Sequence, residues 1–144
     1  MPTRVGDSRT TLRRLTIRDD AFVQEAMASE AVNLAQSGLD PKTHALVRMG
    51  AMIALGAAEP SYRQIVEAAR VAGASTDEVV GTLVAVMTAT GVPRVVAAAP
   101  AVGLAIGYDV HAALEQLDGP VEDTKTTGAP APRRTPQART RREG

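Results

Sequence analysis

The segment spanning residues 39–93 places the strongest constraint on the fold, because it contains three helical patterns in succession. The first begins at Asp40 and Pro41, a capping side chain followed by a residue whose fixed φ suits the first helical turn. The second begins near Glu59, and the third follows Ser75, with a glutamate three residues later as in a capping box. A glycine ends each pattern, and no alternating strand pattern competes. The sequence therefore predicts an all-α protein.

The predicted helices extend on both sides of this segment. Their expected bounds are 20–36, 41–55, 59–72, 76–90 and 91–117, the last being kinked or restarted at Pro100. The second helix is apolar on nearly all sides after Arg48, a pattern typical of a central buried helix. In the fourth helix, the residues expected to face inward are Val80, Leu83, Val84 and Met87.

The two ends of the chain differ in composition from the helical part. Residues 1–18 are rich in Arg and Thr without a clear period, which predicts a flexible arm. Residues 119–144 form a basic tail rich in Pro, Thr and Arg that we expect to be disordered. The domain is thus expected to be a five-to-six-helix bundle over residues 19–118.

A low aromatic content limits the kind of core that the chain can build. Only 2% of the residues are aromatic, namely Phe22, Tyr62 and Tyr108, so Ala, Val, Leu, Ile and Met must form the core. Each alanine buries little area, at about 25 cal/mol per Å², although small side chains let helices approach closely. We expect a homo-oligomer, in which a subunit interface supplies further burial.

The net charge of zero conceals an uneven distribution. Residues 1–20 carry five Arg and three Asp (+2), and residues 21–118 carry five basic and ten acidic side chains (−5). Residues 119–144 carry six basic and three acidic side chains (+3). We expect the basic ends to be solvated, and we expect no nucleic-acid partner, because no basic helix is interleaved with aromatic residues.

The absence of cysteine excludes disulfides, thiolate metal sites and thiol catalysis. With two His in the chain we expect no bound metal, and no motif indicates a cofactor. The first residues contain no apolar run long enough for a signal peptide. The most apolar tract, 79–108, is interrupted by Gly91, Pro93, Arg94 and Pro100, so neither half reaches the ~20 apolar residues of a membrane span. We expect a soluble, cytoplasmic protein.

Three motifs that follow one another along the chain resemble those of the carboxymuconolactone decarboxylase family, which includes the alkylhydroperoxidase D-like proteins. They are Leu-Asp-Pro-Lys-Thr at 39–43, Ala-Gly-Ala-Ser-Thr-Asp-Glu-Val-Val-Gly-Thr-Leu-Val at 72–84 and Gly-Val-Pro at 91–93. The resemblance covers residues 20–117 and is strongest over 39–94. It implies an all-α domain that assembles through helical interfaces, most often as a trimer or hexamer.

The resemblance also implies where a catalytic site would lie. Peroxidase-type members carry a Glu, two Cys and a His, and decarboxylase-type members keep the His. Here the Glu position falls on Ala45 or Leu46, the two Cys positions on Ala58 and Ser61, and the His position on Ile65. Thiol peroxidase chemistry is therefore excluded, and neither activity transfers residue by residue.

Five other polar residues remain as candidates for a site. His44 is the candidate catalytic base, and Arg48, one helical turn away, is the candidate anchor for a carboxylate. Ser61 and Tyr62 at the next helix start, and Arg94 after the Gly-Val-Pro turn, are the other candidate substrate-binding residues. Each also has a structural interpretation: hydrogen bonding for His44, an ion pair for Arg48, helix initiation for Ser61, packing for Tyr62 and a partner chain for Arg94.

Two functions remain open on this basis. In the first, the protein binds or converts a small organic acid or lactone, by proton transfer or decarboxylation. In the second, it is a non-catalytic homo-oligomeric assembly protein whose terminal segments reach a macromolecular partner. A site filled by Ile65, Leu46 and Tyr62 would favour the second.

Overall fold

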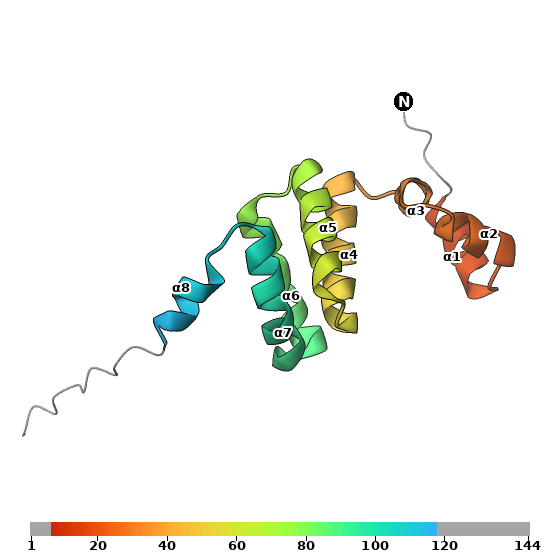
Figure 1. Ribbon diagram of the computed structural model, residues 1–144. Helices are drawn as coiled ribbons and strands as arrows, with labels where there is room; N and C mark the ends of the chain where they lie inside the picture. Colours follow the sequence, from red (N-terminus) through yellow and green to blue (C-terminus); the bar gives the residue numbers. More distant parts are fainter. Residues whose placement is uncertain (1–6, 118–144) are drawn as a thin grey trace, which may run out of the picture.

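The computed structural model describes residues 7–117, in which every regular element is an α-helix (Figure 1). The helices are α1 (Ser8–Thr16), α2 (Asp20–Met27), α3 (Glu30–Ser37), α4 (Pro41–Leu55), α5 (Glu59–Val71), α6 (Thr76–Thr90), α7 (Val92–Ala105) and α8 (Val110–Glu115). The all-α prediction is confirmed. Within the described residues, no helix combines the length and apolarity needed to cross a membrane.

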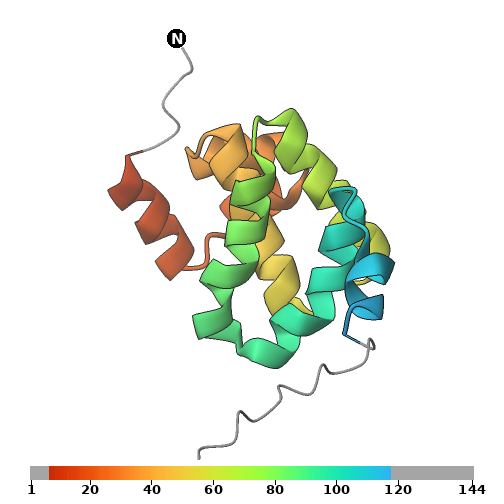
Figure 2. The same ribbon diagram turned by 90° about the vertical axis from the view of Figure 1, so that its left-hand side faces the viewer.

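Helices α4 to α7 form the body of the protein. Helix α4 packs mainly on α5 and α6, and α7 packs mainly on the same two helices, so the four enclose one core (Figure 2). The core is aliphatic, as the composition predicts, with Tyr62 as its one aromatic member. Its buried side chains are Ala45, Met49, Ile53, Tyr62, Ile65, Val66, Ala69, Ala74, Val79, Leu83, Val95, Ala98 and Val102.

Helices α1 to α3 form an arm that stands apart from this body in Figure 1. The helix expected over 20–36 is two helices, because Ser29 accepts a hydrogen bond from the N–H of Val32 and starts α3 afresh. The stretch expected to be a flexible arm without helical period contains α1, which Asp7 caps. Among the described helices, arm and body meet only where α3 contacts α4.

The C-terminal helical stretch also differs from its prediction. Helix α7 runs through Pro100 without a break. Proline has no N–H to donate to the carbonyl of Val96, but both residues lie on the exposed face, where water can reach that carbonyl. The chain breaks later, at Gly107, whose φ of 82° ends the helix before α8. The predicted disordered tail, 119–144, and its expected macromolecular partner lie outside the described residues.

The inner faces of α4 and α6 are narrower than expected. In α6 the buried residues are Val79 and Leu83, whereas Val80 and Val84, both expected to face inward, are 42% and 63% exposed. In α4, expected to be buried on nearly all sides, Leu55 is 80% exposed. Apolar side chains therefore lie on both the inner and the outer side of the body.

The start of α6 is fixed by the predicted capping box. Ser75 Oγ accepts from the N–H of Glu78, and Glu78 Oε2 accepts from the N–H of Ser75. The other carboxylate oxygen of Glu78 accepts from Lys42 Nζ at 2.8 Å, which joins α6 to the first turn of α4. One carboxylate thus supports both a helix start and an inter-helix contact.

This arrangement predicts a loss of stability in acid. The Lys42 hydrogen bond lowers the pKa of Glu78 below 4.5, and the Thr43 hydroxyl lowers the pKa of Asp40 below 3.8. Carboxyls with a depressed folded-state pKa stabilise the protein above their unfolded pKa, and this contribution disappears as pH falls through the folded value. We expect Tm to hold near neutral pH and to fall below pH 4.5, with a shallower fall in Glu78→Gln. Thermal unfolding across the pH range measures this, and identical curves for the two proteins would refute it.

Candidate functional site

His44 lies in the second turn of α4 and faces the arm. Its side chain is 5% exposed, and Nε2 lies 2.8 Å from Asn33 Oδ1 in α3. The amide nitrogen of Asn33 donates to the carbonyl of Ala26 at 3.0 Å, so Oδ1 is the acceptor in the contact with His44. The Nε2 atom therefore carries a proton, and in the neutral imidazole the lone pair is on Nδ1.

Arg48 follows one turn later on the same side of α4. Its Nη1 atom forms an ion pair with Glu30 Oε1 of α3, although the two groups are not aligned as a hydrogen bond. Two polar contacts thus connect α3 with α4, Asn33 with His44 and Glu30 with Arg48. They occupy His44 Nε2 and offset the charge of Arg48, two groups that an incoming carboxylate would otherwise use.

An open pocket of about 500 Å³ lies between α3, α4 and α5 beside His44. Its lining includes Glu30 and is otherwise mainly apolar, from Leu34 of α3 to Ala68 and Val71 of α5. Arg48 does not line this pocket, whereas the Glu30 carboxylate that pairs with it does. The pocket is therefore a weak attractor of organic anions.

The other three candidates lie where α4 ends and α5 begins. Tyr62 is 3% exposed, and its hydroxyl donates to the carbonyl of Met52 at 3.3 Å. Burial raises the pKa of Tyr62, and the nearby Arg94 charge opposes the rise only in part. Ser61 is half-buried in the first turn of α5. These residues close the α4–α5 turn.

Arg94 extends from α7 to the same turn. Its guanidinium lies against Gly56, which ends α4, so a Cβ at Gly56 would overlap with Arg94 Nη1. The carboxyl end of α4 carries the partial negative charge of the helix dipole, which attracts a cation. The partial negative charge at the carboxyl end of α4 thus explains the position of the Arg94 guanidinium.

The candidate residues therefore form two separate groups. His44 and Gly56 are at opposite ends of α4, and a rise of 1.5 Å per residue puts them roughly 18 Å apart along the helix. His44 and Arg48 both contact α3 but line different pockets, and Tyr62 and Arg94 lie together at the α4–α5 turn. No group of three or more His, Asp or Glu among residues 7–117 is arranged to hold a metal ion.

Apolar side chains occupy the glutamate, histidine and first cysteine positions of the resemblance, and Ser61 occupies the second cysteine position. Ile65, at the histidine position, is 2% exposed, and Ala45, at one of the two glutamate positions, is 5% exposed. Both belong to the core, and Leu46 is partly buried against it. Ala58 is the N-cap of α5 and makes no side-chain capping bond there. Side-chain packing therefore fills the histidine and glutamate positions.

Two residues of this region, Glu30 and Asn33, did not emerge from the sequence as candidates. They are three apart on α3, as His44 and Arg48 are four apart on α4, so each pair shares one helix face. Matching polar pairs on consecutive helices are the signal that could have identified them.

Comparison with known proteins adds one finding. Neither the curated proteins nor the solved structures gave a match to this chain. The model of the carboxymuconolactone decarboxylase family matches residues 21–103, which include all of α4, α5 and α6. This match spans more than half of the chain and agrees with the all-α fold and with the motifs at the starts of α4 and α6. The chain therefore belongs to the carboxymuconolactone decarboxylase family.

Proposed function

We propose that this family member works as a homo-oligomeric assembly protein without thiol peroxidase chemistry. The observation that carries the proposal is Ile65, an aliphatic side chain 2% exposed at the position where the resemblance places the family's histidine. An aliphatic group transfers no proton, so general acid–base catalysis has no agent at this point. What the position contributes is packing between α5 and the rest of the body.

The outer faces of α6 and α7 support self-association. Val84 of α6 and Val96 of α7 are 63% and 61% exposed, and Leu104 of α7 is 51% exposed. Between residues 79 and 108 the chain has a single charged side chain, that of Arg94. Extended apolar surface without charge is typical of a protein–protein interface.

Helix α5 offers the contrast within the same body. Its exposed residues include Arg63, Gln64, Glu67 and Arg70, the mixture expected of a helix face that stays in water. The difference between the outer faces of α5 and α6 indicates which of them becomes covered. A closed ring, with a trimer or hexamer as the assembly that the family resemblance implies, would cover the α6 and α7 faces.

The assembly is tested by native mass spectrometry and size-exclusion chromatography on the full chain. We expect a trimer or hexamer at micromolar concentration. A combined Val84→Glu and Val96→Glu variant would place uncompensated charges in the interface, which is strongly destabilising. The subunit concentration at half-dissociation should rise by about tenfold or more, the equivalent of 1.4 kcal/mol.

Gln64→Glu provides the control, because it adds one negative charge to the solvated face of α5, against two in the double variant. It should leave the subunit number and the half-dissociation concentration unchanged. A wild-type protein that is monomeric at micromolar concentration would overturn the proposal, as would equal effects of the two variants.

A second candidate function rests on the lone pair of His44. With Nε2 donating to Asn33, Nδ1 is left as a base beside the pocket between α3 and α5. A small organic acid or lactone bound there would meet a base but also the Glu30 carboxylate, which is why we place this function second. The same native spectra decide it: a retained small acid that is lost in His44→Gln supports catalysis or binding, and its absence from both proteins removes this candidate.

A further inference from the structure

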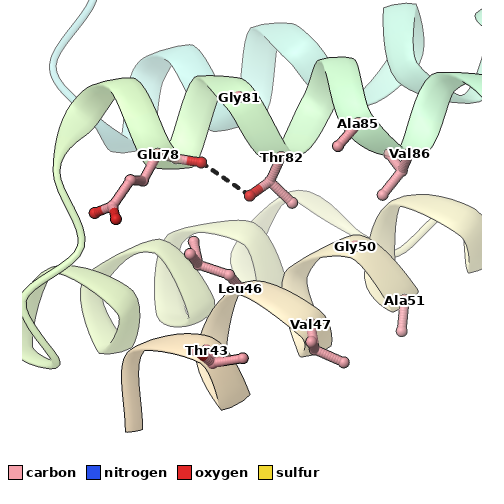
Figure 3. Close-up of a pocket in the computed structure, with 10 residues that line it drawn as sticks. All are labelled: Thr43, Leu46, Val47, Gly50, Ala51, Glu78, Gly81, Thr82, Ala85 and Val86. Carbon is pink, nitrogen blue, oxygen red and sulfur yellow. Dashed lines mark hydrogen bonds between the residues drawn. The ribbon is translucent and has the colours of Figure 1, made fainter. Parts of the chain in front are cut away.

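A shallow groove runs along the outside of the body between α4 and α6. Figure 3 shows Leu46, Val47 and Ala51 of α4 on one side of it and Ala85 and Val86 of α6 on the other. The lining is mostly apolar. It is also uncharged except at one end, where Glu78 and Lys42 pair.

Gly81 of α6 leaves room along this groove, because a Cβ there would meet no atom within 4 Å, whereas Gly50 of α4 is covered by the Val86 side chain. The Thr82 hydroxyl donates to the Glu78 carbonyl of its own helix at 2.9 Å, so its polar group is already satisfied (Figure 3). Such a surface accepts the apolar side of a helix better than it accepts water.

The arm supplies a helix with an exposed apolar side that could fill such a groove. In α1 and directly after it, Leu12, Leu15 and Ile17 are 65%, 54% and 63% exposed, and α1 has no buried residue at all. It packs on α2 alone among the described helices. The chain therefore presents an apolar helix side and an apolar groove that do not meet within one copy.

We infer that the α4/α6 groove of one copy receives the apolar side of α1 from a second copy of this chain. This inference rests on the self-association proposed above and names the surfaces that perform part of it. At 1.5 Å per residue, α1 is about 13 Å long, and the groove from Thr43 to Ala51 extends about 12 Å. The helix thus spans the groove with little excess at either end.

Charge favours the same pairing. Helix α1 contains Arg9, Arg13 and Arg14 and no acidic residue. Arg14 is held by Asp19, which leaves Arg9 and Arg13 without an ion pair among the described residues. The first turn of α6, at the charged end of the groove, is acidic, with Asp77 and Glu78. A basic helix is attracted to that end of the groove.

The second copy, and not the same chain, is the occupant because α3 is already anchored beside α4. The contacts of Asn33 with His44 and of Glu30 with Arg48 hold the arm where α1 touches none of α4 to α7. An arm that is held away from its own body buries its apolar side chains on a neighbouring copy. This exchange of an identical element between protomers is called domain swapping.

A cysteine-free chain allows a direct test by engineered disulfides. Leu15→Cys is made in one preparation and Ala85→Cys in an isotopically labelled second one, and each chain then has one thiol. The two are mixed at micromolar concentration, oxidised with diamide and analysed by mass spectrometry. We expect the disulfide between the two kinds of chain to form about tenfold faster than with a control partner, Glu67→Cys on the solvated α5 face, because docking raises the effective thiol concentration.

The outcomes distinguish this inference from the proposed self-association on which it rests. Oligomers in native spectra with cross-linking equal to that of Glu67→Cys would overturn the arm-in-groove contact and leave the assembly standing. Monomers would overturn both. A double Leu15→Cys and Ala85→Cys chain that closes within itself, at a rate independent of dilution, would show that the arm docks on its own groove and would refute exchange.

Discussion

Replacing Ile53 with alanine should lower the free energy of unfolding by about 2–5 kcal/mol. Ile53 is 0% exposed in α4 and belongs to the one aliphatic core shared by α4 to α7. Removing three of its carbons leaves a cavity that small, already close-packed neighbours fill poorly. Since a domain of this kind is stable by about 5–15 kcal/mol, the loss takes a large share of the total. Urea denaturation at one fixed protein concentration measures it, because assembly makes stability concentration-dependent.

Leu55→Ala is the matched control in the same helix. Leu55 is 80% exposed, so its truncation removes little buried area and should change the free energy of unfolding by less than about 0.5 kcal/mol. Equal losses in the two variants would contradict the division of α4 into a core side and an outer side.

The helix starts were predictable because their signals are local. Asp40 caps α4 through the N–H of Thr43, and Ser75 and Glu78 form the capping box of α6, as the sequence indicated. These contacts lie within three residues of each other along the chain, so no tertiary information is needed to recognise them. The break before α3 was not predicted, although Ser29 is also a capping residue. Ser29 lies inside an apolar period that favoured one long helix.

The orientation of α6 was harder to predict. Val79, Val80, Leu83 and Val84 are all apolar, so no polar residue marks which side faces water. The hydrophobic period then fixes a helix but not its rotation about its axis. Packing on α4 and α7 buries Val79 and leaves Val80 outside, a choice that depends on the neighbours.

The candidate site was predictable only as a set of residue types. The spacing of His44 and Arg48 placed both on one helix face, and in the structure both side chains contact α3. Their partners, Asn33 and Glu30, come from a different helix, and Tyr62 donates to a main-chain carbonyl that has no sequence signature. Sequence spacing reports neighbours on one element, whereas the roles of these side chains are set by contacts between elements.

Replacing Gly56 with alanine should lower the free energy of unfolding by more than the same change at Gly73. Both glycines end a helix with positive φ, 70° and 92°, which should cost an alanine about 1–2 kcal/mol at either position. A Cβ at Gly73 would meet no atom within 4 Å, whereas at Gly56 it would displace the Arg94 guanidinium from the end of α4. The displaced cation gives up its attraction to the helix dipole, a further ~0.3–1 kcal/mol. In an Arg94→Ala background this excess should vanish. Urea denaturation of the wild type and the two glycine variants, each with and without Arg94→Ala, measures it. An excess that persists without Arg94 would mean that the end of α4 does not hold that side chain.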